Sequence, residues 1–186
     1  MNILKMLDGG TGYCPTLGYA VFQNKDGNTI RLSWEELKLK ENGKKYNYAN
    51  AEIQNKDIGT YAFRLCSNLV SIVIPNSVIN ISDNAFYYSG HLEQITISDS
   101  VKRIGAEAFC GCERLASIKI PSSVTDIGEY AFYGCIDLES VVISDNLKTL
   151  GNDVFIYCSR LHSIKYKGQF FETAKEFEAY FRKNNT

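Results

Sequence analysis

Hydrophobic and polar positions repeat along this chain with a step of 23 residues. An Ala-Phe or Val-Phe dipeptide marks each step, at Ala62-Phe63, Ala85-Phe86, Ala108-Phe109, Ala131-Phe132 and Val154-Phe155. Five more apolar columns stay in phase with it, among them Leu69, Leu92, Leu115, Leu138, Leu161 and Ile72, Ile95, Ile118, Val141, Ile164. A fixed period of this length, held over several copies, predicts a solenoid of stacked coils.

Each repeat predicts the short segments that make up one coil. Ile72-x-Ile74 alternates with period 2, so both isoleucines point to one face of a short strand. The segment 77–81 is too short for a helix and predicts a second extended segment or a turn. From Ile81 to Phe86 the pattern resembles one helical turn. A single coil cannot bury these apolar positions alone, so stacked coils must align each column into a continuous core.

The third copy, residues 108–128, reads A-F-C-G-C-E-R-L-A-S-I-K-I-P-S-S-V-T-D-I-G. It resembles the BspA-type leucine-rich repeat, A-F-x-x-C-x-x-L-x-x-I-x-I-P-x-S-V-x-x-I-G, and the resemblance covers roughly residues 57–170. It implies an α/β repeat solenoid, a leucine-rich-repeat right-handed superhelix with short parallel strands. Members of this family are often surface or secreted bacterial and protist proteins that bind host or matrix proteins. The resemblance therefore implies a protein-binding role.

We expect three parts in the chain. Residues 57–170 form the solenoid of about five coils. Residues 1–56 form either an N-terminal cap or a small separate module. Residues 171–186 form a C-terminal capping helix, because the terminal apolar faces of a solenoid need covers.

Both ends carry local signals for these covers. In the N-terminal part, apolar segments at 19–22 and 29–32 flank an Asp-Gly turn and predict a hairpin, followed by a short helix that opens at Ser33. In the C-terminal part, Thr173-x-x-Glu176 predicts a capping box. The helix that follows, about 173–183, places Phe177, Tyr180 and Phe181 on one face.

The candidate chemistry does not assemble into an active site. Four cysteines occupy one column, with Ser89 in the slot of the second coil, and predict small buried side chains: Cys66, Cys112, Cys135 and Cys158. Cys110-Gly-Cys112 has no second cysteine pair to complete a metal site. His91 and His162 lie about three coils, or roughly 14 Å, apart. We therefore expect no enzyme activity, no cofactor and no metal.

The outward face of the strands remains as the candidate binding surface. Two columns of side chains point to solvent between the core isoleucines: Ser71, Gln94, Ser117, Ser140, Ser163 and Val73, Thr96, Lys119, Val142, Lys165. The small polar column could admit a partner backbone closely. The alternative is a solvated sheet face that binds no partner.

A second set of side chains follows the Ala/Val-Phe dipeptides. Tyr87, Tyr88, Tyr133 and Tyr157 form either an aromatic patch along another edge or packing at the rim of the core. Tyrosine is favoured at interfaces because it buries a large area at low entropic cost. The sequence leaves both interpretations open.

Charge and hydropathy restrict the kinds of partner that we expect. The net charge is −1 and no basic stripe exists, so we expect no nucleic-acid partner. Residues 62–153 carry 6 basic and 11 acidic side chains. No apolar run is long enough to span a bilayer, and the first residues do not form a signal peptide. The resemblance implies a secreted or cell-surface protein; a complete chain without a leader would be cytoplasmic.

We therefore expect a non-enzymatic module that binds another protein. The alternative is a structural spacer, or a fragment of a larger assembly, without its own recognition role. The sequence names neither the partner nor the oligomeric state.

Overall fold

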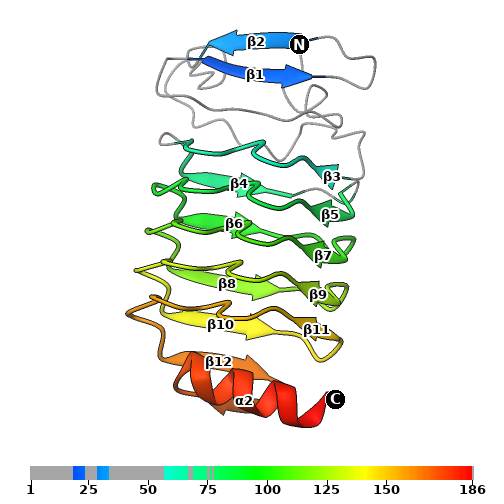
Figure 1. Cartoon of the computed structure of the whole chain (residues 1–186), viewed down its shortest axis with the longest axis vertical. Coiled ribbons are helices and arrows are strands. Elements are labelled where there is room, and N and C mark those ends of the chain that lie inside the picture. The colour runs from blue at the N-terminus through cyan, green and yellow to red at the C-terminus, as the bar shows by residue number, and fades with distance from the viewer. Residues whose placement is uncertain are drawn as a thin grey trace.

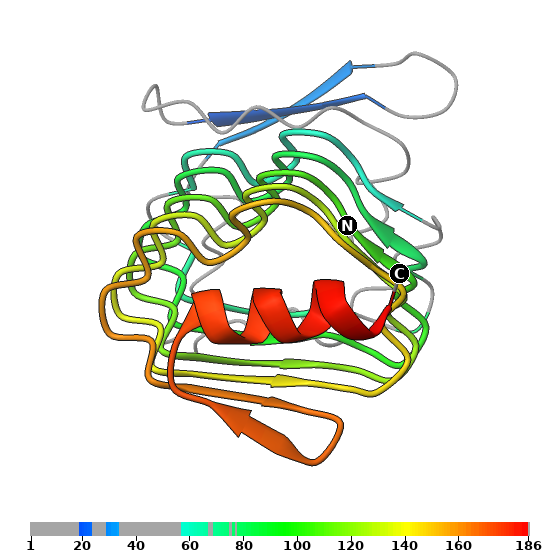
Figure 2. The same cartoon turned by 60° about the horizontal axis from the view of Figure 1, so that its bottom comes forward.

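The computed structural model describes residues 19–23, 29–33, 57–66, 69–74, 76 and 78–185, and for the first two ranges the backbone alone. Figure 1 shows short strands stacked in two parallel rows, with helix α2 at the C-terminal end. Figure 2 shows that successive coils run around a common interior and that α2 lies across its end. The predicted solenoid of short parallel strands is confirmed.

One side of each coil is a short strand, and these strands form two sheets. These strands are β4 (Ser71–Val73), β6 (Gln94–Thr96), β8 (Ser117–Ile120), β10 (Ser140–Ile143) and β12 (Ser163–Tyr166). β4 pairs with β6, and β8 with β10 and β10 with β12, all in parallel, whereas β6 and β8 are adjacent but not paired. Val141 lies opposite Ile118 and Ile164, so the register follows the repeat.

The second side is a five-stranded parallel sheet of two-residue strands, in the order β11-β9-β7-β5-β3. They are β3 (Asp57–Ile58), β5 (Asn80–Ile81), β7 (Arg103–Ile104), β9 (Asp126–Ile127) and β11 (Thr149–Leu150). A glycine follows the last three strands because neighbouring backbones nearly touch there. A Cβ at Gly128 would lie 2.6 Å from the carbonyl carbon of Gly105 and 2.7 Å from Cα of Ala106.

The third side consists of turns, and the predicted helical turn between Ile81 and Phe86 is wrong. Alternate N–H groups donate to the next coil instead, Phe86 N to Ala108 O at 2.7 Å and Tyr88 N to Cys110 O at 2.7 Å. Asn84 and Tyr88, on either side of Phe86, have φ of 59° and 55°. Positive φ is incompatible with a right-handed helix. The backbone hydrogen bonds between coils take the place of the helical ones at this position.

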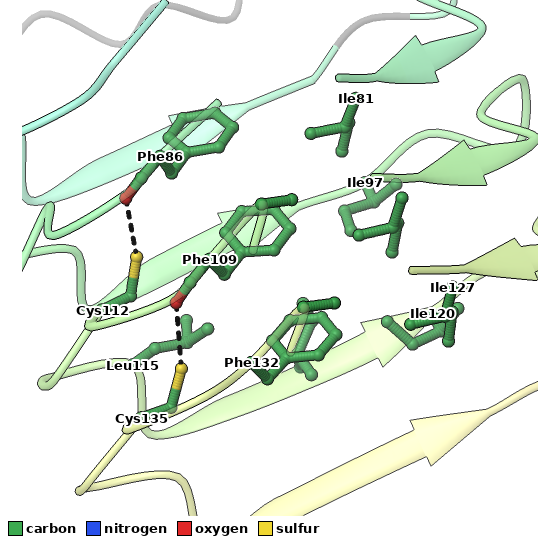
Figure 3. Close-up of a cluster of buried hydrophobic side chains, with 14 of the residues drawn as sticks. Ile81, Phe86, Ile97, Phe109, Cys112, Leu115, Ile120, Ile127, Phe132 and Cys135 are labelled. Carbon is green, nitrogen blue, oxygen red and sulfur yellow. Dashed lines mark hydrogen bonds between the residues drawn. The ribbon is translucent and has the colours of Figure 1, made fainter. Parts of the chain in front are cut away.

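The core is a set of stacked columns, as the repeat predicts. Phe63, Phe86, Phe109, Phe132 and Phe155 form one continuous stack with centroid separations of 4.8, 5.0, 5.2 and 5.5 Å. The rings are tilted by no more than 11° from one another. Figure 3 shows three of these rings beside the isoleucines of both sheets. The separations match the spacing of neighbouring β-strands, so each coil contributes one layer.

Helix α2 (Ala174–Asn184) covers the last layer. The Phe177 ring meets the end of the phenylalanine stack edge-on, 6.3 Å from the Phe155 centroid and at 62° to it. Thr173 is the N-cap, and its hydroxyl accepts from Glu176 N at 3.2 Å. The Glu176 carboxylate accepts from Glu172 N, one residue before the position that a capping box would use. The prediction of a capping helix with a buried aromatic face is confirmed.

Three further strands lie at the ends. β13 (Gln169–Phe171) pairs antiparallel with β12 and extends that sheet, which the sequence did not predict. β1 (Tyr19–Gln23) and β2 (Thr29–Ser33) form the predicted antiparallel hairpin. The short helix expected after Ser33 lies outside the described residues.

Candidate binding face

The structure brings the ten predicted surface positions together as two adjacent columns on one face of the β4–β12 strands. Their register is fixed by the strand pairing: Ser117 lies opposite Ser140, which lies opposite Ser163, and Lys119 opposite Val142, which lies opposite Lys165. Ser71 pairs with Gln94, and Val73 with Thr96, in the other two strands. All ten side chains are exposed or half-buried, while the positions between them face the core.

The C-terminal end of this face is its most apolar part. Val142 is 41% exposed, and Phe170 is 70% exposed. Phe170 lies opposite Lys165 in the β12–β13 pair, so both side chains project from the same face. Lys165 Nζ lies 5.5 Å from the Phe170 ring centroid, which is a cation–π contact.

Sequence reasoning missed Phe170 as a surface residue. It belongs to the face only because Lys167 and Gly168, with φ of 47° and 74°, turn the chain back on itself. Positive φ at both central residues is the signature of a type I′ hairpin turn. The Lys-Gly pair after the last strand was the one signal that could have predicted it.

A shallow hollow of about 470 Å³ adjoins these side chains at the carboxyl ends of the strands. It is lined by Ser122, Val142, Ile143, Ser144, Asp145, Asn146, Lys165, Lys167 and Gly168. Its rim is held by bonds between coils: Ser144 Oγ donates to Pro121 O at 2.8 Å, and Lys167 N donates to Asp145 Oδ1 at 3.0 Å. The hollow therefore offers both a lysine pair and a carboxylate beside an exposed valine.

The cysteine column is structural, but it is more than a row of small apolar side chains. The free thiols of the column donate to the carbonyl of the phenylalanine one coil earlier, Cys112 to Phe86 and Cys135 to Phe109, both at 3.3 Å (Figure 3). Ser89 Oγ makes the same bond to Phe63 O. Serine can fill this slot because the column needs a donor.

Among the described cysteines, burial lowers the reactivity of the Cys110 and Cys112 thiols. Cys110 is 5% exposed, and burial raises its thiol pKa from 9.0 to about 11. Burial likewise raises the pKa of Cys112. A protonated, buried thiol is a poor nucleophile and metal ligand. Cys66 is disulfide-bonded, whereas Cys110, Cys112, Cys135 and Cys158 are free.

The two histidines lie on exposed loops in different coils. His162 Nδ1 is 2.9 Å from Arg160 O, a local contact with the backbone. Within the described ranges, no three His, Cys, Asp or Glu side chains gather closely enough to hold a metal ion.

The four tyrosines that follow the dipeptides lie on the turn side of the coils. Tyr87 and Tyr88 are neighbours at 4.7 Å between centroids, and Tyr133 meets Tyr157 edge-on at 5.1 Å. Tyr88 is 45% and Tyr157 66% exposed, so neither is part of the core.

The repeats identify the family to which this chain belongs. Residues 41–162 match the family of BspA-type leucine-rich repeat regions in six copies. This chain belongs to the BspA-type leucine-rich repeat family. The match begins at residue 41, ahead of the predicted solenoid boundary at residue 57 and outside the described residues. Repeat modules of this family generally bind proteins and are typically non-enzymatic.

Two solved structures resemble this BspA-type chain. A leucine-rich cell-surface protein from Faecalibacterium prausnitzii is 27% identical with a TM-score of 0.64, over 90% of this chain and 41% of that one. A leucine-rich repeat protein from Bacteroides ovatus is 28% identical with a TM-score of 0.58, over 85% of this chain and 40% of that one. The chain thus spans about two fifths of each. No curated protein matches it.

In the described part of the chain, no helix has both the length and the apolar character that a membrane span requires.

Proposed function

We propose that this BspA-type chain is a non-enzymatic module that binds another protein across the face of the β4–β12 strands. The observation that carries the proposal is the two in-register columns of exposed side chains, extended by Val142 and Phe170 at one end. A rigid sheet face needs little ordering when a partner binds, which favours affinity. Exposed apolar side chains inside a polar surround are typical of the centre of an interface.

We further propose that the protein works at the cell surface. The support is the resemblance to a leucine-rich cell-surface protein from Faecalibacterium prausnitzii. A spacer role within a longer protein is the alternative, because the chain spans only part of that relative. Labelling intact source cells with an impermeant reagent tests the location, and labelling only after lysis would contradict it.

The binding face is tested by cross-linking the chain to its partners on source cells and in the medium. Val142→Glu places a charge at the apolar end of the face and should reduce recovery of the specific partner at least tenfold. Lys148→Gln changes the net charge by the same amount on an exposed residue next to β11, in the other sheet, and should leave recovery unchanged. Equal recovery with both folded variants would favour the spacer role.

A further inference from the structure

Tyrosines gather along the turn side of the solenoid, away from the proposed binding face. We call this set the tyrosine edge: Tyr61, Tyr87, Tyr88, Tyr130, Tyr133 and Tyr157. Tyr133 meets both Tyr130 and Tyr157 edge-on, with centroids 6.0 and 5.1 Å away. Burial raises the pKa of Tyr133, and Tyr157 and Tyr88 add to the shift, so the rings lie close together across the coils.

The fold does not require an aromatic ring at two of these positions. Tyr88 and Tyr157 have φ of 55° and 60°, the left-handed region that glycine adopts without cost. The equivalent residues of the third and fourth coils are Gly111 and Gly134, with φ of 70° and 66°. Other residues with a Cβ adopt this region on the turn side as well, such as Leu65 at the same position of the first coil. The feature that folding leaves unexplained is therefore the exposed ring itself, since Tyr88 is 45% and Tyr157 66% exposed.

Carboxylates accompany the rings. Glu129 and Asp153 are exposed beside Tyr130, and the Glu129 carboxylate raises the pKa of Tyr130, followed by burial and Asp153. Glu107 lies near Tyr87, whose pKa burial raises. The edge therefore combines electron-rich ring faces with negative charge, which is complementary to a guanidinium or ammonium group.

The chain itself supplies one example of that contact. The Arg64 guanidinium carbon lies 5.2 Å from the Tyr61 ring centroid and 5.6 Å from that of Tyr87. At the other end of the edge, no lysine or arginine of the described residues lies over Tyr130, Tyr133 or Tyr157. The C-terminal half of the edge therefore has tyrosine rings and carboxylates, but no lysine or arginine of the described residues stacks on those rings.

We propose that the tyrosine edge is a second binding surface, which takes an arginine-rich segment of a partner protein. One arginine stacks on the Tyr133–Tyr157 pair and contacts the carboxylates of Glu129 and Asp153. This surface is separate from the β4–β12 face, so either can fail without the other. An arginine is preferred to a lysine because the planar guanidinium both stacks on a ring and pairs with a carboxylate.

The test is binding of a fluorescein-labelled peptide of arginines and serines to the full chain, followed by fluorescence anisotropy. Tyr157→Gly removes one ring, and it should keep or raise the thermal midpoint because glycine suits the left-handed backbone. We expect it to weaken binding about fivefold, and Tyr157→Gly combined with Glu129→Gln to weaken it more than tenfold.

Matched controls separate this surface from general electrostatic attraction and from the β4–β12 face. Phe170→Leu removes an exposed ring on the other face and Glu139→Gln removes an exposed charge near β10, and neither should change peptide binding. Equal weakening by these controls would overturn the proposal. Binding of neutral oligosaccharides to the edge, with no binding of the arginine peptide, would also overturn it and identify a carbohydrate surface instead.

Discussion

Gly128 and Gly134 should respond very differently to the same added methyl group. At Gly128 the new Cβ would lie 2.6 and 2.7 Å from backbone atoms of Gly105 and Ala106 in the preceding coil, distances that real Cβ atoms do not show. At Gly134 it would meet nothing within 4 Å, but φ there is +66°. Gly128→Ala therefore tests the contact between coils, whereas Gly134→Ala tests only the backbone conformation.

The magnitudes follow from these geometries. Gly128 N donates to Ile104 O at 2.8 Å, and relieving the clash requires the coils to separate at this bond. Overpacking costs about 1–3 kcal/mol, and a weakened hydrogen bond adds about 1 kcal/mol. We expect Gly128→Ala to lower the free energy of unfolding by about 3 kcal/mol. Gly134→Ala should cost about 1 kcal/mol, the penalty for a Cβ in the left-handed region.

Urea denaturation followed by circular dichroism measures both costs, and thermal denaturation checks them. For a chain of this size each kcal/mol corresponds to about 2–4 °C in the thermal midpoint. The expected drops are roughly 6–12 °C for Gly128→Ala and 2–4 °C for Gly134→Ala. Equal costs for the two variants would show that neighbouring coils do not approach closely after β9, and the reasoning about the glycine column would fail.

Three further outcomes are expected. Ile118→Ala, at a buried position of β8, should cost about 2–5 kcal/mol, whereas Ser117→Ala should stay within about 0.5 kcal/mol; equal costs in urea denaturation would mean that the strand phase is wrong. Thr173→Ala removes the N-cap of α2 and should lower the free energy of unfolding by about 1 kcal/mol in the same assay. An unchanged free energy would mean that the Thr173 hydroxyl does not stabilise the helix. Burial raises the pKa of Cys110 from 9.0 to about 11, so the stability that the protonated thiol contributes should be fully present below pH 9 and be lost as the pH rises through 11. The thermal midpoint should therefore fall less between neutral and alkaline pH in Cys110→Ala than in the unmodified chain. An identical fall in both would contradict this.

The strands could be predicted from the sequence because stacking imposes the same requirement on every coil. Ile118 and its equivalents must all be apolar, and Ser117 and its equivalents must all face solvent, so both columns are visible as a period. The ten residues of the candidate face follow directly from that phase. Their use as a binding surface does not, because a solvated sheet face would show the same alternation.

The turn side could not be predicted in the same way. Its backbone requires positive φ on both sides of each phenylalanine, and glycine reveals this requirement only in the third and fourth coils. Tyr88 and Tyr157 hide it in the second and fifth coils. The hydrogen-bonding role of the cysteine column was hidden as well, since a buried thiol resembles an apolar side chain, and Ser89 was the only sign of a donor.

The spacing of the coils restricts the shape of a segment that could follow the tyrosine edge. The phenylalanine stack advances by 4.8 to 5.5 Å per coil, so Tyr87 and Tyr133, which occupy equivalent positions two coils apart, are separated along the edge by about 10 Å. A polyproline II helix rises about 9 Å in each three-residue turn and returns its side chain to the same side. A β-strand returns a side chain after about 7 Å, which matches neither one coil nor two. A peptide with arginine at every third position should therefore bind the edge more tightly than one of equal charge with arginine at every second position. Equal affinity would mean that net charge, and not the repeat of the coils, governs the contact.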